Sequence, residues 1–535
     1  MTIEFNFSPR WRLALDLEEQ DNYNWVKIRG NLYSDKKELF TAKGIEQFSD
    51  ALSSANGFYA LVKHRPNEVM AAVDHVRSIP LFYSQRGQTL ILSDDAEWVR
   101  SQVDDNEMDP IAREEFLLAG YVTGSDTLYS HVKQLQAGEC LAATYDAGRI
   151  AITKRRYYRF QHVEPAHYNA AVLGEELKEI TTGIVQRLIQ HAAGRQIVLP
   201  LSGGYDSRLI AALLKQSGYK NIICYTYGRF DSKETKYSRQ IAEALGFAWL
   251  FVPYSVESWH REWASPAAVA YRKLASNHTS LPHVQDWLAI KHLVSEGLIE
   301  NNAVVVPGHT GDFISGGHIP SVVFEKPILY ENDLLGALIN AHLSNSPSRE
   351  IKFLKDGLLN NRLRERIGEK FDNTPVGFAN LYEAWEWQER QAKYIVNSVR
   401  VYEQFELDWW LPLWDIEFLH FWEKAPLIIR KERIWFKAWI KKIYAAVASE
   451  DLSSALGNSA DRSIPVRGGV YVVKKIFPKF VIRKIYRSYY IHLYNRHPLA
   501  FNGLVDKRSL ESSMRAGYNI IGVYSQLFLD GRWGE

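Results

Sequence analysis

The first 160 residues carry short runs of apolar and β-branched residues that are separated by turn residues. Strands of a packed, β-rich domain typically show this pattern. A hairpin with its turn at Asp146 to Gly148 is expected to close this region, over residues 138–160. The other runs that we expect to form strands are 24–34, 56–64, 68–75, 81–84 and 89–95.

A first helix is expected to begin near Tyr168. From Gln196 the pattern changes to continuous apolar runs that alternate with segments of helical period. Continuously apolar strands are typical of a parallel sheet that helices cover on both faces. We therefore expect a doubly wound α/β domain whose ligand lies beyond the carboxyl ends of the strands. The expected strands are 196–201, 221–228, 247–254 and 302–308, and the expected helices are 207–218, closed by Gly218, and 232–246, capped by Ser232 and ended at Gly246.

The remainder, roughly 325–535, is predicted to be mostly helical. No acidic residue lies between Asp461 and Asp506, and residues 466–497 carry eight Lys or Arg among many aromatic side chains. One interpretation is an amphipathic face at an anionic membrane surface. The other, which is commoner, is an ordinary helical cap with solvated lysines.

Composition limits the class of protein. With 535 residues, 46% of them hydrophobic, the chain is long enough for two or three globular domains. The net charge of +2 gives no argument for nucleic acid as a partner. Cys140 and Cys224 stand far apart, which argues against disulfides and zinc sites. Without a signal pattern or a long apolar run, we expect a cytoplasmic enzyme.

The most informative motif is SGGYDS, which directly follows the strand QIVLPL. Adjacent glycines permit close approach of a ligand, and the helix that follows offers free N–H groups and a positive dipole end. These features predict a phosphate site, and Asp206 then implies a Mg²⁺ ion between carboxylate and phosphate. The motif lacks the lysine of a Walker A loop.

SGGYDS resembles the pyrophosphate loop of N-type ATP pyrophosphatases. VVVPGHTGDFISGGH (304–318) and DWWLPLWDIEF (408–418) are similar to two later segments of asparagine synthetases and their relatives. VDHVRSIPLFYS (73–84) and GYVTGSDTLYSHVKQLQAGECL (120–141) resemble class II glutamine amidotransferase domains. The resemblance covers about residues 20–450.

The resemblance implies three regions. An Ntn-hydrolase-like β-rich sandwich is expected over 1–160, an ATP pyrophosphatase domain over 170–450, and a basic, aromatic helical extension over 451–535. It also implies that ATP and Mg²⁺ are bound, with Asp206 and Asp312 as the metal ligands. The residues that it assigns to ATP and pyrophosphate are Leu201, Ser202, Gly203, Gly204, Asp206, Ser207, Tyr227 and Gly308.

The chain departs from the family at its N-terminus. Glutaminase domains of this class begin Met-Cys-Gly, whereas this chain begins Met1-Thr2-Ile3. A thiolate is strongly nucleophilic at neutral pH and a hydroxyl is not. We therefore expect that glutaminase activity has been lost, with Thr2 as an N-terminal nucleophile the minor alternative.

A second departure is His309, where asparagine synthetases carry Glu and β-lactam-forming relatives carry Tyr. Histidine titrates near neutrality, so it could deprotonate an attacking ammonium. The alternative is a histidine that only hydrogen-bonds the loop. Glu389 is our prediction for the group that orients His309, with Glu386 and Glu383 as alternatives, although a solvated helix face would explain all three.

Other departures concern the substrate and the later cations. Asp408 stands where Glu is usual, and Trp410 stands where Arg is usual. Because an indole cannot pair with a substrate carboxylate, Trp410 argues against free aspartate as the substrate. Lys437 matches a catalytic lysine of the family. The position of a later catalytic lysine is open, among Arg462, Arg467 and Lys474.

The prediction is an ATP-dependent amide ligase that adenylates a carboxylate, releases pyrophosphate and transfers the acyl group to ammonia or an amine. The carboxylate is a small molecule or part of a glycan, for instance a uronic acid of a bacterial surface polysaccharide. The alternatives are asparagine synthesis, an intramolecular cyclase of the β-lactam or lasso-peptide type, and a scaffold that only binds nucleotide. Peripheral membrane contact and a homodimer are further hypotheses.

Overall fold

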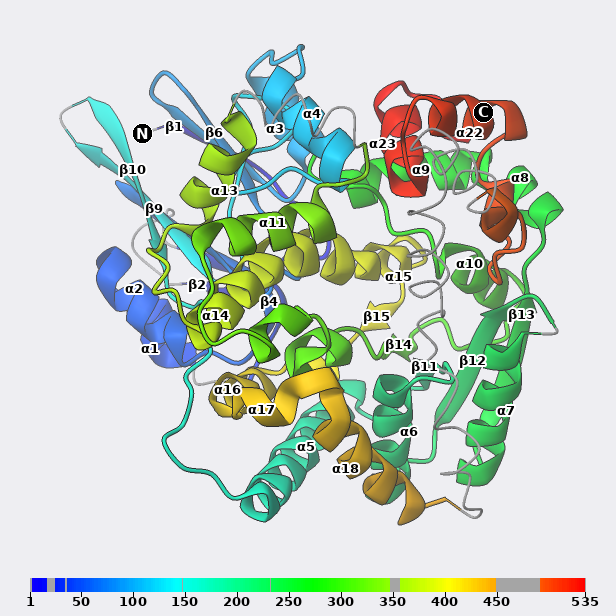
Figure 1. The fold of residues 1–535 in the computed structure, drawn as a ribbon. Coiled ribbons are helices and arrows are strands. Elements are labelled where there is room, and N and C mark those ends of the chain that lie inside the picture. The colour runs from blue at the N-terminus through cyan, green and yellow to red at the C-terminus, as the bar shows by residue number, and fades with distance from the viewer. Residues whose placement is uncertain are drawn as a thin grey trace.

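Figure 1 shows the computed structural model of the chain, which describes residues 2–16, 25–33, 36–146, 148–230, 232–346, 357–448 and 491–534. The blue and cyan strands of the N-terminal part lie to the left, and the parallel sheet lies at the lower right. The red C-terminal helices lie at the upper right, beside α8 (Val256–Trp263) and α9 (Pro266–Ser276).

The N-terminal part is a sandwich of two sheets. One sheet has the order β10-β9-β5-β4-β3-β2 and the other the order β1-β7-β6-β8. Its strands are β1 (Thr2–Asn6), β2 (Arg12–Asp16), β3 (Trp25–Leu32), β4 (Gly57–Arg65), β5 (Glu68–Val73), β6 (Phe82–Arg86), β7 (Thr89–Ser93), β8 (Lys133–Gln134), β9 (Glu139–Asp146) and β10 (Arg149–Arg156). The expected β-rich sandwich is confirmed, with β1, β2 and β8 added to the predicted strands.

Alternation along β4 explains the layers. Phe58 and Val62 enter the main core, which also contains Leu90 and Leu92 of the second sheet. Tyr59 faces the opposite way, into a smaller core with helical side chains. The helices of this part, which the strand-like pattern did not predict, are α1 (Lys36–Thr41), α2 (Gly44–Ser53), α3 (Ala96–Gln102) and α4 (Pro110–Ala119).

The second part contains a five-stranded sheet of order β13-β12-β11-β14-β15, in which every pair is parallel. Its strands are β11 (Ile197–Pro200), β12 (Ile222–Gly228), β13 (Ala248–Pro253), β14 (Val304–Val305) and β15 (Asp408–Trp409). The helices α5 (Ala170–Ala192), α6 (Tyr205–Ser217), α7 (Lys233–Leu245) and α10 (Trp287–Ser295) accompany it. The expected parallel α/β fold is confirmed, although β14 is shorter than predicted and β15 was not predicted.

The predicted caps are correct. Gly218 and Gly246 have left-handed φ values of 75° and 67°, and the Ser232 side chain accepts a hydrogen bond from the Thr235 N–H at 3.1 Å. A left-handed residue after the last turn lets a helix end without a steric penalty when that residue is glycine. The helical termini of this domain are therefore encoded locally.

The later described residues are mostly helical, as predicted. These elements are η1 (Phe313–Gly317), η2 (Ser321–Phe324), α11 (Glu331–His342), α13 (Leu358–Ile367), α14 (Pro375–Glu386), η3 (Trp387–Ile395), η4 (Val396–Val399), α15 (Arg400–Gln404), η5 (Pro412–Trp414), α16 (Ile416–Lys424), α17 (Leu427–Arg430), η6 (Lys431–Arg433), α18 (Ile434–Ala445), η7 (Phe501–Gly503), α22 (Lys507–Arg515) and α23 (Ile520–Leu529). Of these, η1 and η3 are π-helices.

The C-terminal helices bridge the two parts of the chain. Phe528 of α23 stacks on Phe116 of α4 at a ring distance of 5.6 Å, and Trp533 packs edge-on against Trp263 of α8 at 5.1 Å. Most of the basic stretch expected to contact a membrane lies outside the described residues. In the part of the chain that the structure describes, no helix is both long enough and apolar enough to cross a bilayer.

Candidate active site

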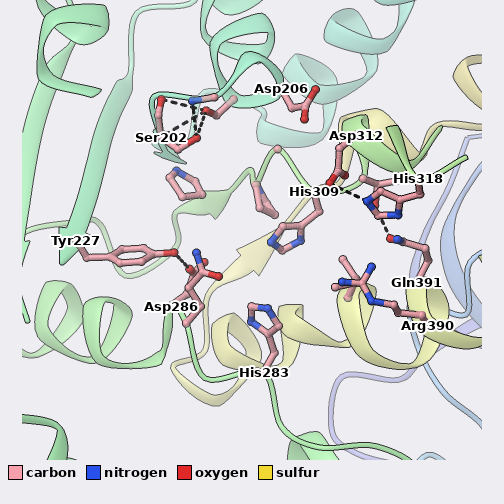
Figure 2. A pocket seen from close by; sticks show the side chains of 18 residues that line it. Ser202, Asp206, Tyr227, His283, Asp286, His309, Asp312, His318, Arg390 and Gln391 are labelled. Carbon is pink, nitrogen blue, oxygen red and sulfur yellow. Dashed lines mark hydrogen bonds and ion pairs between the residues drawn. The ribbon is translucent and has the colours of Figure 1, made fainter. Parts of the chain in front are cut away.

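A cavity of about 310 Å³ opens at the carboxyl ends of β11, β12 and β14. In Figure 2, Ser202 and Asp206 lie on one side of this cavity, His283 and Arg390 lie on the opposite side, and His309 lies between them. Both loops that the sequence singled out therefore meet at one edge of the sheet, as the position of ligand sites in parallel sheets predicts. We call this cavity the synthetase pocket.

The first loop is folded by its own hydroxyl groups. The Ser202 Oγ accepts a hydrogen bond from the Gly204 N–H at 3.1 Å, and the Ser202 N–H donates to the Ser207 Oγ at 3.2 Å. Helix α6 begins at Tyr205 without a side-chain cap, so its first N–H groups are directed to the loop. A helix start of this kind favours an anion.

The glycines of the two loops act through close approach rather than through unusual backbone angles. Neither Gly203 nor Gly204 has a positive φ. A Cβ on Gly308 would lie 2.8 Å from the Ser207 nitrogen, and one on Gly311 would lie 2.3 Å from the Asp206 carboxylate. The second loop therefore packs against the first only because both positions lack a side chain.

Asp206 and Asp312 both line the synthetase pocket. Burial raises the pKa of Asp206 to about 6, and the charge of Asp312 adds to this, although the ion pair with Arg433 opposes it. Burial also raises the pKa of Asp312, but the hydrogen bond and charge of His318 outweigh this effect and leave its pKa well below the usual range. Two carboxylates at one cavity are the oxygen ligands that Mg²⁺ prefers.

His318, which sequence reasoning missed, lies between two carboxylates. Its Nε2 is 3.1 Å from the Asp312 Oδ2 and its Nδ1 is 2.5 Å from the Glu386 Oε1. Burial lowers the pKa of His318, but the charge of Glu386 and the hydrogen bonds to both acids raise it to about 10. His318 is therefore an imidazolium at neutral pH, and it fixes the orientation of Asp312.

Arg433 is a second residue that sequence reasoning missed. Its guanidinium pairs with the Asp206 carboxylate, and its Nε donates to the Ser315 Oγ at 2.7 Å. Glu432 and Arg433 both have left-handed φ values, 52° and 61°. A Cβ on Gly317 would lie 2.8 Å from the Arg433 Cδ. The only sequence signal was the SGG run at 315–317, whose glycines admit this arginine.

His309 lines the pocket, and its Nδ1 lies 3.3 Å from the Ser398 Oγ. Burial lowers its pKa, so the ring is neutral near pH 7 and able to accept a proton. Its ring lies 6.4 Å from that of His283, whose pKa burial lowers to about 4. The predicted position of His309 is thus correct, and its catalytic role stays a prediction.

Glu389 does not orient His309, which corrects our expectation. Its carboxylate accepts hydrogen bonds from the Gly124 N–H at 3.0 Å and from Lys393 at 2.6 Å. Both side chains are fully buried. The turn from Trp387 to Ile395 is a π-helix, so Glu389 points toward the N-terminal part while Arg390 and Gln391 line the pocket. Of the alternatives, Glu386 binds His318 and Glu383 binds Arg430.

Tyr227 lies at the pocket edge and its hydroxyl donates to Asp286. The Asp286 carboxylate also accepts from Tyr402 at 2.7 Å. Leu201 is buried and lines a smaller adjoining cavity together with Tyr225 and Leu499 of the C-terminal segment. Leu201 and Tyr227, which the resemblance assigns to ATP, therefore lie where β11 and β12 end.

Lys437 does not line the pocket. Its Nζ lies 6.0 Å from the centre of the Tyr205 ring, and its charge lowers the pKa of Asp206, so it lies close to the first loop. Three further cations were predicted for the late catalytic position. All three lie outside the described residues, namely Arg462, Arg467 and Lys474.

Asp408 and Trp410 face away from the pocket. Asp408 pairs with His191 at 2.9 Å and with Arg195 at 2.9 Å. Trp410 is buried and stacks on His191 at a ring distance of 4.8 Å. The indole therefore does not touch the cavity at which the carboxylate is expected, and the argument from Trp410 against aspartate is not supported by the geometry.

The chain joins a two-sheet sandwich to a parallel sheet with two interlocked loops. This architecture defines the class of protein, in which an amidotransferase-like part precedes a nucleotide-binding part. Residues 22–158 match the glutamine amidotransferase domain family, and residues 185–445 match the asparagine synthase family. The two matches together give the domain architecture of the asparagine synthetase family. The match supports an ATP-dependent, amide-forming carbon–nitrogen ligase.

Other comparisons add little. No curated protein matches the chain. An NH3-dependent NAD synthetase from Campylobacter jejuni, in complex with the nitrate ion, is 13% identical with a TM-score of 0.20, over 42% of this chain and 95% of that chain. A glutamine phosphoribosylpyrophosphate amidotransferase from B. subtilis, complexed with ADP and GMP, is 12% identical with a TM-score of 0.18, over 55% and 63%. With scores this low, the assignment rests on the family matches.

Proposed function

We propose that the chain adenylates a carboxylate with ATP, releases pyrophosphate and transfers the acyl group to ammonia or an amine. The observation that carries this proposal is the interlocking of the loops 202–207 and 308–312, which brings Asp206 and Asp312 to one cavity beside the start of α6. An anion-binding helix start beside two acids suits the metal complex of a phosphate chain.

The residues present fit a Mg²⁺ ion. Among the described residues, no group of three or more His, Cys, Asp or Glu side chains could hold a metal ion on its own. Mg²⁺ is commonly held by one or two carboxylates, with phosphate oxygens and water completing its shell. Asp206 and Asp312 would hold it, and when bound it would neutralise charge on the phosphates.

In the first step, a carboxylate oxygen forms a bond to the α-phosphorus, and the bond from that phosphorus to the bridging oxygen breaks. The products are an acyl-AMP and pyrophosphate. Ser202, Gly203, Gly204 and Ser207 would bind the departing phosphates at the start of α6. Arg433 and Lys437 supply positive charge beside this loop, where negative charge develops on the leaving group.

In the second step, the amine nitrogen attacks the acyl carbon, and the bond from carbon to the AMP oxygen breaks. The attacking nitrogen must lose a proton. His309 is neutral and faces the pocket, so it is suited to accept that proton, and Ser398 at 3.3 Å holds its other ring nitrogen.

We infer that the amine does not come from glutamine hydrolysis by this chain. Its two cysteines, Cys140 and Cys224, are both buried. Burial raises the pKa of the Cys140 thiol to about 12 and that of Cys224 further still. A buried thiol with a raised pKa is a poor nucleophile. Free ammonia or an amine would then be the acceptor.

The carboxylate that we propose is a uronic acid, free or within a surface polysaccharide. The pocket offers neutral hydrogen-bonding groups suited to a ligand rich in hydroxyls, namely Gln285, Thr310 and Gln391. The Arg390 guanidinium also lines it and is suited to a carboxylate. Cytoplasmic location belongs to the same proposal, since ATP is the co-substrate; the homodimer stays a prediction.

The test is ATP–pyrophosphate exchange with Mg²⁺, with aspartate and a panel of free and glycan-linked uronic acids as carboxylates. We expect exchange with a uronic acid and none with aspartate. Exchange with aspartate would instead establish asparagine synthesis. ATP binding without exchange on any carboxylate would favour the nucleotide-binding scaffold and contradict the proposal.

A further inference from the structure

A second cavity, of about 400 Å³, lies between the N-terminal sandwich and the parallel sheet. It shares no lining residue with the synthetase pocket. It lies near the start of β15, at Asp408, and beside Arg195, which precedes β11. The two cavities are thus associated with opposite ends of these parallel strands, and we call this one the arginine cavity.

The arginine cavity has an excess of positive charge. Four arginines line it, Arg10, Arg12, Arg29 and Arg195, against two carboxylates, those of Glu403 and Asp408. Arg29 is neutralised within the chain, because it pairs with Asp94 at 2.7 Å and with Glu403 at 2.7 Å. Arg195 is likewise paired, with Asp408 at 2.9 Å. Two guanidinium groups remain.

Arg10 and Arg12 are anchored to backbone carbonyl groups. An Arg10 guanidinium nitrogen donates to the Glu403 carbonyl at 2.9 Å, and one of Arg12 donates to the Gly30 carbonyl at 2.9 Å. Neither makes an ion pair with a described residue. A guanidinium has five N–H donors in a planar fork that matches carboxylate and phosphate oxygens, so a single anchor leaves most of them for a ligand.

The wall beside these arginines is apolar and contains one unsatisfied donor. Phe58, Trp409 and Trp410 line the cavity. The Trp410 indole N–H is buried and finds no acceptor among the described residues. A buried donor without a partner costs stability, and it is usually satisfied by water or a ligand.

We propose that the arginine cavity is a second binding site, for a small organic anion whose carboxylate or phosphate group binds Arg10 and Arg12 and whose apolar part packs on the tryptophans. Because residues of both parts of the chain form its wall, the ligand stabilises their contact. This site is independent of the reaction proposed for the synthetase pocket.

The test is calorimetric titration of the full chain with inorganic phosphate, phenyl phosphate and benzoate, in the presence of EDTA. We expect saturable binding of phenyl phosphate or benzoate that is tighter than that of inorganic phosphate. The comparison of these two ligands shows whether the anionic group is a phosphate or a carboxylate. The double variant Arg10→Gln/Arg12→Gln should bind at least tenfold more weakly.

Two controls keep the test specific. Arg149→Gln removes an exposed arginine of β10, and Arg433→Gln removes a cation of the synthetase pocket. Arg149→Gln should bind the probes as the unaltered chain does, and Arg433→Gln should keep the binding event that Arg10→Gln/Arg12→Gln loses. Loss of binding in Arg433→Gln with retention in the double variant would overturn the proposal, because it would place the anion in the other cavity. If the double variant does not fold, the single variant Arg12→Gln is titrated in its place, and it too should bind the probes more weakly.

A further variant tests whether the chain supplies its own anions. Asp16, Glu18, Glu19 and Asp21 follow Arg12 in the sequence. If the probes bind only after these four residues are changed to their amides, the arginines are satisfied within the chain and the proposal is overturned. Equal binding with and without the change supports an external ligand.

Discussion

The synthetase pocket and the contact between the N-terminal sandwich and the rest of the chain, which we call the seam, both contain buried charged side chains. The two regions differ in how these charges are paired. In the seam, Glu389 and Lys393 are fully buried and pair at 2.6 Å, and Arg29 is shared between two acids. In the pocket, Asp206 and Asp312 each have a cationic partner on one side and line the cavity on the other. Charges that are fully paired hold the parts together, whereas charges that still face a cavity are available to a ligand.

This comparison predicts that pocket variants lose turnover and keep stability. Asp206→Asn should lower ATP–pyrophosphate exchange by about 10²–10³-fold, because it removes a carboxylate at the site of developing charge. Its melting temperature should change little, since the pKa of about 6 shows that burial already disfavours the charged form. Exchange assays and thermal unfolding are measured on the same protein. Unchanged exchange would contradict the role of Asp206.

Variants in the seam should instead lose stability. Lys393→Met leaves the Glu389 carboxylate buried without its partner, so we expect a loss of about 3–5 kcal/mol in the free energy of unfolding. Lys393 also donates to the Val122 and Gly124 carbonyl groups, at 2.9 and 2.6 Å. Urea unfolding measures the loss.

The exposed pair of Arg239 and Glu243 is the matched control, and Arg239→Ala should cost less than about 1 kcal/mol. The double variant Glu389→Leu/Lys393→Met should recover much of the stability, because no buried charge remains unpaired. If Lys393→Met unfolds at the same urea concentration as the unaltered chain, the seam does not depend on this ion pair.

His309→Gln separates the two chemical steps. We expect amide formation to fall by about 100-fold, because general-base catalysis typically contributes at least this much. ATP–pyrophosphate exchange should be nearly unchanged, since the first step needs no proton acceptor there. Equal losses in both assays would show that His309 holds the loop rather than accepts a proton.

Arg433→Gln should raise the KM for ATP by about tenfold, the value of one hydrogen bond to a charged group. The guanidinium pairs with the Asp206 carboxylate, beside the loop that is expected to bind the phosphates. Arg433→Lys should recover part of the loss, because the charge is kept while the planar fork is not. A KM that does not change would mean that Arg433 serves only to hold Asp206.

The smallest effect concerns a buried histidine remote from the pocket lining. Burial lowers the pKa of His342 to about 4, so the unfolded chain binds a proton more readily than the folded chain does. Its contribution to stability is complete above the unfolded pKa of about 6.5 and is lost as the pH falls toward 4. We expect a loss of about 1 kcal/mol between pH 6.5 and 5.5, which urea unfolding can measure. His342→Gln should remove this part of the pH dependence, and an unchanged pH dependence would contradict it.

The features that were predictable from the sequence are those that a few neighbouring residues encode. The runs at 196–201 and 221–228 predicted β11 and β12, and Gly218 and Gly246 predicted the helix ends. Short helices such as α4 were missed among strand-like runs, although Asp109 caps α4 and Pro110 follows it.

The meeting of the two loops also followed from the sequence, by a topological argument. Parallel strands present their carboxyl ends at one edge of a sheet, so the segments after β11 and β14 had to lie near each other. Asp206, His309 and Asp312 were therefore placed in one cavity without any structural information. Their sequence separation did not matter, because the sheet sets the distance.

By itself the sequence determined the fold class, the position of the synthetase pocket and most of its loop residues. Only the tertiary structure decided which side chains pair, because that depends on the direction of each Cα–Cβ bond rather than on order along the chain. The π-helix at 387–395 turned Glu389 toward Lys393 and presented Arg390 to the pocket. In the same way, His318 and Arg433 reached the two acids from segments whose pattern carried no such signal.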